Sequence, residues 1–167
     1  MKIFYGAAIQ GARIRGEKSK INKELIDFIK INGFEVISEH TTGKNKEETV
    51  RLLEKSIGYL PKEESERRRY VRKKMIEAIE GDIEGAIFEV SIPSLGVGIE
   101  IAHCYLRPRI GLGEIKILAL YENNYWPNDL TSMIQGITKD ELPYFRLKKY
   151  NSLDQAKEYI HEFLIEI

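Results

Sequence analysis

The chain contains 167 residues, 43% of them hydrophobic and 31% charged, and its 26 lysines and arginines balance its 26 aspartates and glutamates. This length and composition are typical of a single globular domain that buries its own core. A formal net charge of zero argues against a protein that binds nucleic acid over its whole surface, because such proteins carry a basic excess.

Cysteine, histidine and hydropathy patterns exclude further classes. The single cysteine, Cys104, rules out an intrachain disulfide and a cysteine-cluster metal site. The three histidines are scattered, without the spacing of a zinc-protease motif. The N-terminus lacks the layout of a signal peptide, and no apolar run reaches the roughly 18–20 residues of a transmembrane helix. We therefore expect a soluble, cytoplasmic protein without a metal ion.

The first half of the chain alternates predicted strands and helices. Ile3–Ala8 is a short apolar run that predicts a buried strand, and Phe34–Ile37 predicts a second. Two charged helices are expected over Glu47–Ile57 and Glu64–Glu80. A further helix between the two strands is indicated by apolar residues at helical spacing, followed by a glycine that favours a helix end: Ile21, Leu25, Phe28, Ile29 and Gly33.

The second half continues the alternation. A strand over Gly85–Val90, apolar except for one glutamate, leads into a predicted loop over Pro93–Gly98 and a helix over Ile99–Leu106. Ile115–Tyr121 is the clearest central strand. The last elements are a short helix over Asp129–Ile134, an edge strand over Tyr144–Leu147 and a final helix for which Ser152 and Gln155 form a capping box.

Strands that alternate with helices predict a parallel sheet covered on both faces. In such α/β folds, ligands bind at the carboxyl ends of the strands. That rule selects the loops Ala7–Arg13 and Glu89–Gly98. The chain has no internal repeat and no linker, so we expect one domain over residues 1–167.

The segment Glu89–Glu100, which reads EVSIPSLGVGIE, carries the densest functional signal. Its glycines and proline predict a tight turn with exposed backbone N–H groups, and Ser91 and Ser94 add hydroxyl groups. Such a turn before a helix is suited to bind an anion. Glu100 falls in the first turn of the expected helix, where a carboxylate can attack or stabilise an oxocarbenium-like sugar carbon. From the spacing alone, an equal alternative is that Glu100 only interacts with the helix dipole and has no catalytic role.

The segment Phe88–Ile101, FEVSIPSLGVGIEI, closely resembles the signature of the 2'-deoxynucleoside 5'-phosphate N-hydrolases, a family of the nucleoside 2-deoxyribosyltransferase superfamily. Shorter matches occur at Ile9–Arg13, Ser38–His40 and Thr131–Gly136. Together with the order of elements, the resemblance covers most of the chain. It implies a flavodoxin-like, Rossmann-like three-layer sandwich with a mostly parallel five-stranded sheet. It also implies a homodimer without a metal or cofactor.

The resemblance further implies an enzyme that hydrolyses the N-glycosidic bond of (deoxy)nucleoside 5'-monophosphates through a covalent glycosyl-enzyme. Glu100 becomes the nucleophile, Ser94 a phosphate ligand, and Ser132 a ligand that reaches into the site of the neighbouring subunit. The other residues assigned to substrate binding are Gly6, Ile9, Gln10, Gly11, Arg13, His40, Glu89, Gly96 and Gly98. The expected partner is a nucleotide or nucleoside, with no role for nucleic acid or membrane.

The first strand departs from the family pattern. The position of the family's active-site tyrosine is Phe4, and the neighbouring Tyr5 points to the opposite face of the strand. The phosphate-binding serine and arginine positions are Ala8 and Gln10. Arg13 is retained and is a partial substitute for the lost guanidinium group.

The group that helps the base to leave has several candidates. The family's catalytic aspartate falls on Ile76 when residues are counted without gaps, and Glu77 is adjacent. We expect Glu77 or Tyr5 to act with Glu100. Glu80, four residues after Ile76, and Glu89 at the end of the third strand are the alternatives.

Two other functions remain open at this point. The chain can exchange bases between nucleosides, as the deoxyribosyltransferases do, or bind a nucleotide without catalysis. The basic run Glu66–Lys74 has two interpretations as well. It is either a patch that faces phosphate or nucleic acid, or a solvated helix face balanced by glutamates, and composition favours the second.

Overall fold

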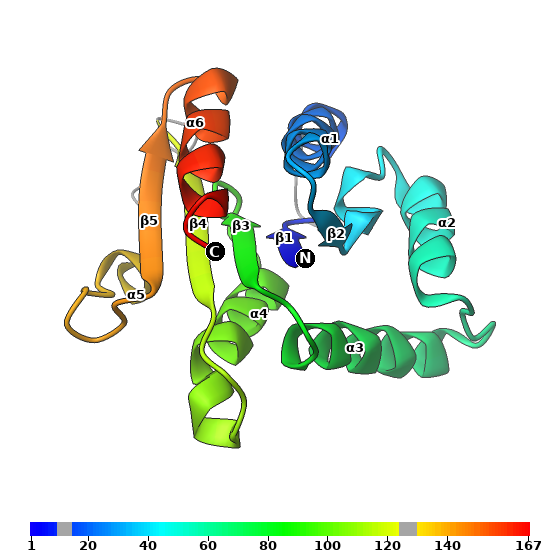
Figure 1. The fold of residues 1–167 in the computed structure, drawn as a ribbon. Coiled ribbons are helices and arrows are strands. Elements are labelled where there is room, and N and C mark those ends of the chain that lie inside the picture. Colours follow the sequence, from blue (N-terminus) through cyan, green and yellow to red (C-terminus); the bar gives the residue numbers. More distant parts are fainter. Residues whose placement is uncertain (10–14, 124–129) are drawn as a thin grey trace.

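The computed structural model describes residues 1–9, 15–123 and 130–167. Its centre is a five-stranded sheet with the strand order β2-β1-β3-β4-β5, in which every neighbouring pair is parallel (Figure 1). The strands are β1 (Lys2–Ala7), β2 (Glu35–Ile37), β3 (Gly85–Glu89), β4 (Lys116–Glu122) and β5 (Phe145–Tyr150). The expected flavodoxin-like α/β class is therefore confirmed, and the described sheet is parallel throughout.

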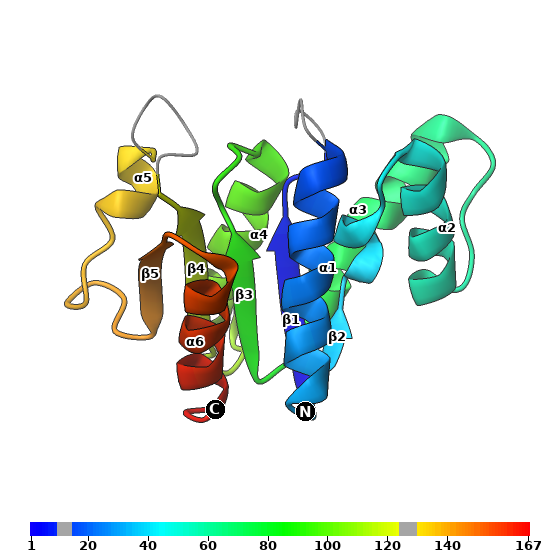
Figure 2. The ribbon, with the colours of Figure 1, turned by 90° about the horizontal axis from the view of Figure 1, so that it is seen from above.

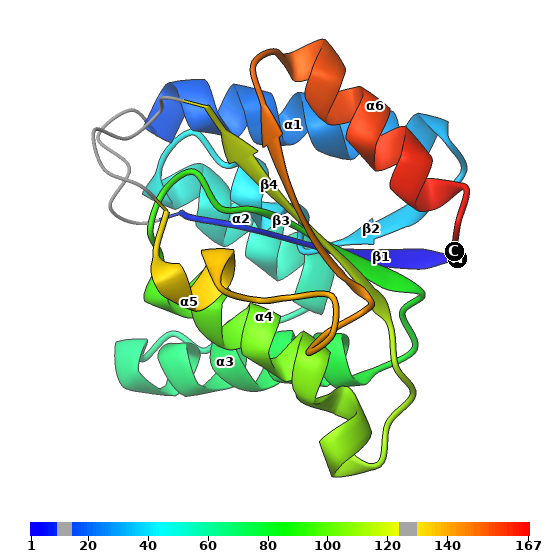
Figure 3. The same ribbon diagram turned by 90° about the vertical axis from the view of Figure 1, so that its left-hand side faces the viewer.

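Helices cover both faces of the sheet and form the outer layers. They are α1 (Arg15–Ile31), α2 (Lys46–Ile57), α3 (Glu64–Glu80), α4 (Leu95–Leu106), α5 (Ser132–Gln135) and α6 (Leu153–Leu164), with short 3₁₀ helices η1 (Glu39–Thr42) and η2 (Arg107–Ile110). Helices α1 and α6 lie on one face, and α3 and α4 lie on the other (Figures 2 and 3). Helix α2 lies beyond the β2 edge of the sheet, and α3 runs from α2 towards α4 (Figure 1).

The two faces of the sheet bury separate apolar cores. Along β1, Ile3 and Tyr5 enter the core under α1 and α6, whereas Phe4 enters the core under α3 and α4. Along β3, Ile87 enters the core under α1 and α6, and Phe88 enters the core under α3 and α4. Successive side chains of a strand point to opposite faces, so a sheet covered on both sides needs continuous apolar runs. This requirement explains why the strands could be predicted from the sequence.

Helix α4 begins earlier than the sequence predicted, and this corrects the expected loop over Pro93–Gly98. Ser94 is the N-cap, and its Oγ accepts a hydrogen bond from the Val97 N–H at 3.4 Å. Glycine has a low helix propensity, but the cap and the burial of apolar side chains of α4 outweigh it. Gly96 and Gly98 therefore lie within the helix, and Glu100 is in its second turn rather than its first.

The other element boundaries shift by a few residues. β5 is an edge strand as expected, but it extends to Tyr150. α5 covers only Ser132–Gln135, and Asp129, where the short helix was expected to begin, is outside the described residues. Ser152 caps α6 through the Gln155 N–H at 3.2 Å, while the Gln155 side chain accepts from the N–H of Asn151.

Candidate active site

A pocket of about 670 Å³ lies between α2, α3 and α4, beside the end of β1. Glu100 and Gly96 of α4 line it together with Ile9, which follows β1. Parallel strands end at one edge of the sheet, so this is the edge at which α/β folds bind ligands. We call this cavity the Glu100 pocket.

The Glu100 side chain lies close to the backbone of β1. A methyl group at Gly6 would lie 3.0 Å from Oε2 of Glu100 and 2.5 Å from the Phe88 ring. Only a residue without a side chain leaves the room that this approach requires. Gly6, predicted to bind substrate, therefore has a visible role in accommodating Glu100.

Burial raises the pKa of Glu100 to about 7. Within the described part of the chain, no ion pair neutralises this carboxylate. Charged and neutral forms of Glu100 are thus both populated near neutral pH. A partly buried carboxyl group of this kind in a cavity is typical of a catalytic position.

The walls of the Glu100 pocket divide into an apolar part and a basic part. Val71, Met75 and Ile76 of α3 supply apolar surface. Arg67 and Arg72, also of α3, add positive charge. Such a lining suits a ligand with a flat apolar ring and an anionic group.

Three predicted site residues cannot be compared with the pocket. Gln10, Gly11 and Arg13 lie outside the described residues.

The structure does not bring Glu77 to Glu100. Glu77 is exposed on α3 and pairs with Lys74 at 2.8 Å and with Lys73 at 3.7 Å. The hydrogen bond from Lys74 lowers the pKa of Glu77. Ile76, the residue reached by ungapped counting, lines the pocket instead.

The alternative acid Glu80 also has a partner outside the pocket lining. Its Oε1 lies 3.4 Å from Nδ1 of His103, so the two residues connect α3 to α4. Neither residue lines the Glu100 pocket.

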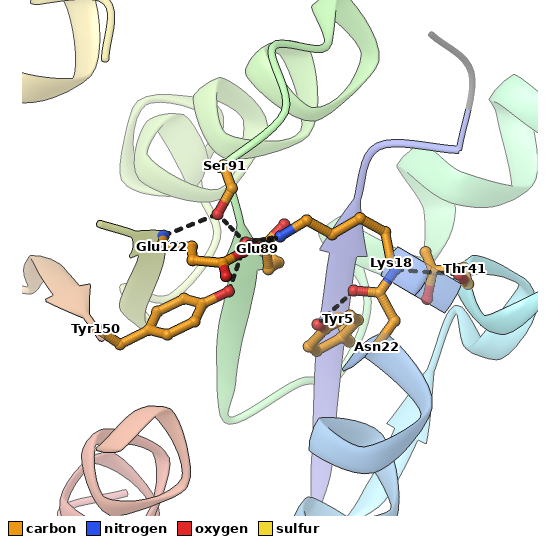
Figure 4. Close-up of polar contacts among 8 residues, drawn as sticks. All are labelled: Tyr5, Lys18, Asn22, Thr41, Glu89, Ser91, Glu122 and Tyr150. Carbon is orange, nitrogen blue, oxygen red and sulfur yellow. Dashed lines mark hydrogen bonds and ion pairs between the residues drawn. The ribbon is translucent and has the colours of Figure 1, made fainter. Parts of the chain in front are cut away.

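Tyr5 lies on the face of the sheet opposite Glu100. Its hydroxyl donates a hydrogen bond to Oδ1 of Asn22 at 3.0 Å, and the Asn22 amide donates to the Thr41 carbonyl at 3.1 Å (Figure 4). All three residues are buried. The structure therefore separates Tyr5 from Glu100, as the alternation along β1 requires.

Glu89 is buried on the same face as Tyr5, within a polar network (Figure 4). Its Oε1 accepts hydrogen bonds from the Tyr150 hydroxyl at 3.0 Å and from Ser91, and lies 3.6 Å from Nζ of Lys18. Lys18 also pairs with Glu122 at 2.6 Å, and Ser91 accepts the Glu122 N–H at 2.8 Å. Burial raises the pKa of Glu89, against the opposing effect of Lys18.

This Glu89 network connects α1 to the ends of β3, β4 and β5. Glu89 does not line the Glu100 pocket, although the sequence assigned it to substrate binding. Glu89 accepts a hydrogen bond from Ser91, which in turn accepts the Glu122 N–H, so the network holds the turn that leads into α4. Lys18 and Tyr150 were not indicated by any sequence motif. A buried carboxylate such as Glu89 requires a partner, but the sequence does not show that Lys18 is the cation that supplies it.

His40 is buried, and its Nδ1 lies 3.4 Å from Oγ of Ser38. Burial lowers the pKa of His40 to about 4, so the ring is neutral at physiological pH. Ser38 in turn contacts the sulfur of Met75, which lines the Glu100 pocket. His40 itself does not line the Glu100 pocket.

Ser94 and Gly98 line a second, apolar pocket of about 850 Å³ on the other side of α4. Leu95, Ile99 and Met133 line it too, with exposed fractions of 90%, 50% and 78%. We call it the apolar groove. Ser132 is exposed on α5, directly before Met133, so one copy of the chain does not bring it to Glu100.

Among the described residues, no group of three or more His, Cys, Asp or Glu side chains is arranged to hold a metal ion. No helix in the same part of the chain is long and apolar enough to cross a membrane.

Comparison with known proteins gives a consistent assignment. No protein-family model matches the chain. A curated protein of Thermofilum pendens, named "Putative 2'-deoxynucleoside 5'-phosphate N-hydrolase 1", is 31% identical over 166 residues, which cover 98% of this chain and 95% of that protein. Similarity at this level over nearly the full length extends beyond the short signature around Glu100. The chain therefore belongs to the 2'-deoxynucleoside 5'-phosphate N-hydrolase family.

Proposed function

We propose that the protein hydrolyses the N-glycosidic bond of (deoxy)nucleoside 5'-monophosphates, with Glu100 as the nucleophile. The observation that carries this proposal is the Glu100 carboxyl group in a pocket at the carboxyl edge of the sheet, with a pKa of about 7. The name of the Thermofilum pendens relative supports the same reaction.

In the first step, an ionised oxygen of Glu100 attacks the anomeric carbon of the sugar. The carbon–nitrogen bond breaks, and its electron pair leaves with the base. In the second step, water attacks the same carbon and releases the sugar 5-phosphate, which regenerates the Glu100 carboxylate. The base gains one proton overall, and the water supplies it.

The start of α4 is the proposed phosphate site. Ser94 supplies a hydroxyl group, and the glycines Gly96 and Gly98 leave the first turn uncovered by side chains. A helix N-terminus favours an anion through its free N–H groups and its dipole. Gln10, Gly11 and Arg13 remain proposed ligands from the loop after β1.

We propose a homodimer in which a second copy covers the apolar groove. Leu95, Ile99 and Met133 expose apolar surface that a partner copy would bury. Ser132 lies at this surface and would reach the phosphate of the partner's substrate. This arrangement gives the exposed α5 a role that it lacks in a single copy.

The second candidate function is nucleotide binding without catalysis. It is favoured by Ile76, which occupies the pocket where the family carries a catalytic aspartate. A binder would hold the same ligands but would release no base.

The test is chromatography of free bases after incubation with ribo- and deoxyribonucleotides and their nucleosides. Release of base from nucleoside monophosphates, absent from boiled protein, would support hydrolysis. A second free base in the mixture detects exchange, because exchange forms a new nucleoside. If no substrate releases base while calorimetry detects nucleotide binding, the proposal of catalysis is wrong and the binding function holds.

A further inference from the structure

One face of α3 lines the Glu100 pocket over most of the length of the helix. The lining residues form two adjacent rows with intervals of four residues, Arg67, Val71 and Met75, and Arg68, Arg72 and Ile76, which places them on one helix face. At a rise of about 1.5 Å per residue, Arg72 begins about 6 Å and Arg67 about 13 Å along the helix from Ile76. The N-terminal end of α3 is nearer α2, and its C-terminal end is nearer α4 (Figure 1).

Glutamates of the chain offset only part of the positive charge of this face: Glu64 lines the pocket, and Glu63 and Glu64 both interact electrostatically with Arg67. Arg68 pairs with Glu64 at 2.5 Å, and Lys74 pairs with Glu77 at 2.8 Å. Within the described part of the chain, neither Arg67 nor Arg72 forms an ion pair. Arg67 is half-buried and makes one long hydrogen bond, 3.4 Å, to the carbonyl of Lys62.

A further cation faces the same cavity from a different element. Lys46 is in the first turn of α2 and lines the Glu100 pocket beside α3. Four cationic side chains from two helices, Lys46, Arg67, Arg68 and Arg72, therefore line a cavity that contains two carboxylates, Glu64 and Glu100. This charge pattern requires more than an uncharged nucleoside to complement it.

We infer that Arg67 and Arg72, assisted by Lys46, bind an anionic group of the substrate at the end of the pocket away from Glu100. The inference rests on the proposed function for the identity of the substrate. A carboxylate on the base and the 5'-phosphate both have the chemistry that a guanidinium group binds through paired hydrogen bonds. The pocket thereby selects charged over neutral nucleosides.

The test measures binding without turnover, in the Glu100→Gln background, by titration calorimetry. The ligands are uridine, 5-carboxyuridine, its neutral analogue 5-carbamoyluridine, and uridine 5'-monophosphate. Arg67→Gln and Arg72→Gln are compared with Arg69→Gln, a matched control. Arg69 is exposed on the same helix and does not line the pocket.

We expect at least one anionic ligand to bind more tightly than the neutral ligands, and each pocket variant to weaken it by about 10- to 100-fold, as for a lost charge-assisted hydrogen bond. Uridine affinity should stay unchanged, and Arg72→Lys should restore part of the loss. A loss confined to 5-carboxyuridine identifies a base carboxylate as the bound group. A loss confined to uridine 5'-monophosphate identifies the phosphate, and would move the phosphate site from the start of α4 to these arginines.

The inference is wrong if neither anionic ligand binds more tightly than uridine. It is also wrong if the pocket variants behave like Arg69→Gln, or weaken uridine by the same factor. Because these measurements need no catalysis, failure of the wild-type protein to release base would reject the proposed hydrolysis and leave this result intact.

Discussion

At the scale of single residues, the account depends on the ionisation of Glu100. A carboxyl group acts as a nucleophile only when it is charged, and burial sets the pKa of Glu100 at about 7. We therefore expect kcat/KM for base release to rise about tenfold per pH unit below pH 7 and to level off above it. The measurement is a pH–rate profile with a nucleoside monophosphate, corrected for the second ionisation of its phosphate, which has a pKa of about 6 and is titrated separately. A profile already flat from pH 5 would contradict the raised pKa.

The same shift has a consequence for stability. The pKa of Glu100 is higher in the folded state than in the unfolded chain, so its ionisation between about pH 4.5 and 7 destabilises the fold. Glu100→Gln removes this charge and should stabilise the protein at pH 8 by about 1–3 kcal/mol, with little effect at pH 4.5. Thermal unfolding at the two pH values checks the prediction. An equal change in Tm at both would show that packing, not ionisation, is responsible.

At the scale of elements, the Glu89 network holds α1 against the ends of three strands. Lys18→Met would leave Glu89 buried without its cation. Breaking one partner of a buried ion pair costs about 3–5 kcal/mol, so we expect a comparable loss in the free energy of unfolding. The double variant Lys18→Met/Glu89→Gln should recover part of it. Urea unfolding of the three proteins measures both effects, and no recovery in the double variant would mean that Lys18 acts through other contacts.

The sequence predicted the elements better than it predicted their edges or their contacts. Apolar runs and helical periodicity located the five strands and the long helices, because these patterns follow directly from burial on two faces. The start of α4 was missed, since the glycines Gly96 and Gly98 indicate a loop when packing is unknown.

The candidate site was predictable where the argument depended on topology. Glu100 and Ile9 line the same pocket because Ile9 follows β1 and Glu100 is on α4, which follows β3. These parallel strands end at the same edge of the sheet. Glu77 does not line the pocket although the adjacent Ile76 does, because a helix turns each successive side chain to another direction. For the basic run of α3, composition favoured a solvated face over a patch that faces phosphate or nucleic acid. Only the position of α3 beside α4 gives Arg67 and Arg72 a cavity to line.

At the scale of the whole molecule, the apolar groove is the surface proposed to join two copies. Met133→Glu places a charge on a side chain that is 78% exposed in one copy, so the monomer should fold normally. In the dimer this charge would be buried without a partner, and dissociation should follow. Sedimentation velocity should detect a dimer for the wild-type protein and a monomer for the variant. A wild-type monomer, or a variant that remains dimeric, would contradict the proposed interface.

The central claim is that Glu100 breaks the glycosidic bond. The most direct measurement is the rate of free-base release from a nucleoside monophosphate by the wild-type protein and by Glu100→Gln, with Glu54→Gln as a control for an exposed carboxylate outside the pocket. The account predicts equal rates for the wild type and Glu54→Gln and a loss of at least about 1,000-fold for Glu100→Gln, the scale of removing a nucleophile. Base release by Glu100→Gln at the wild-type rate would contradict the account.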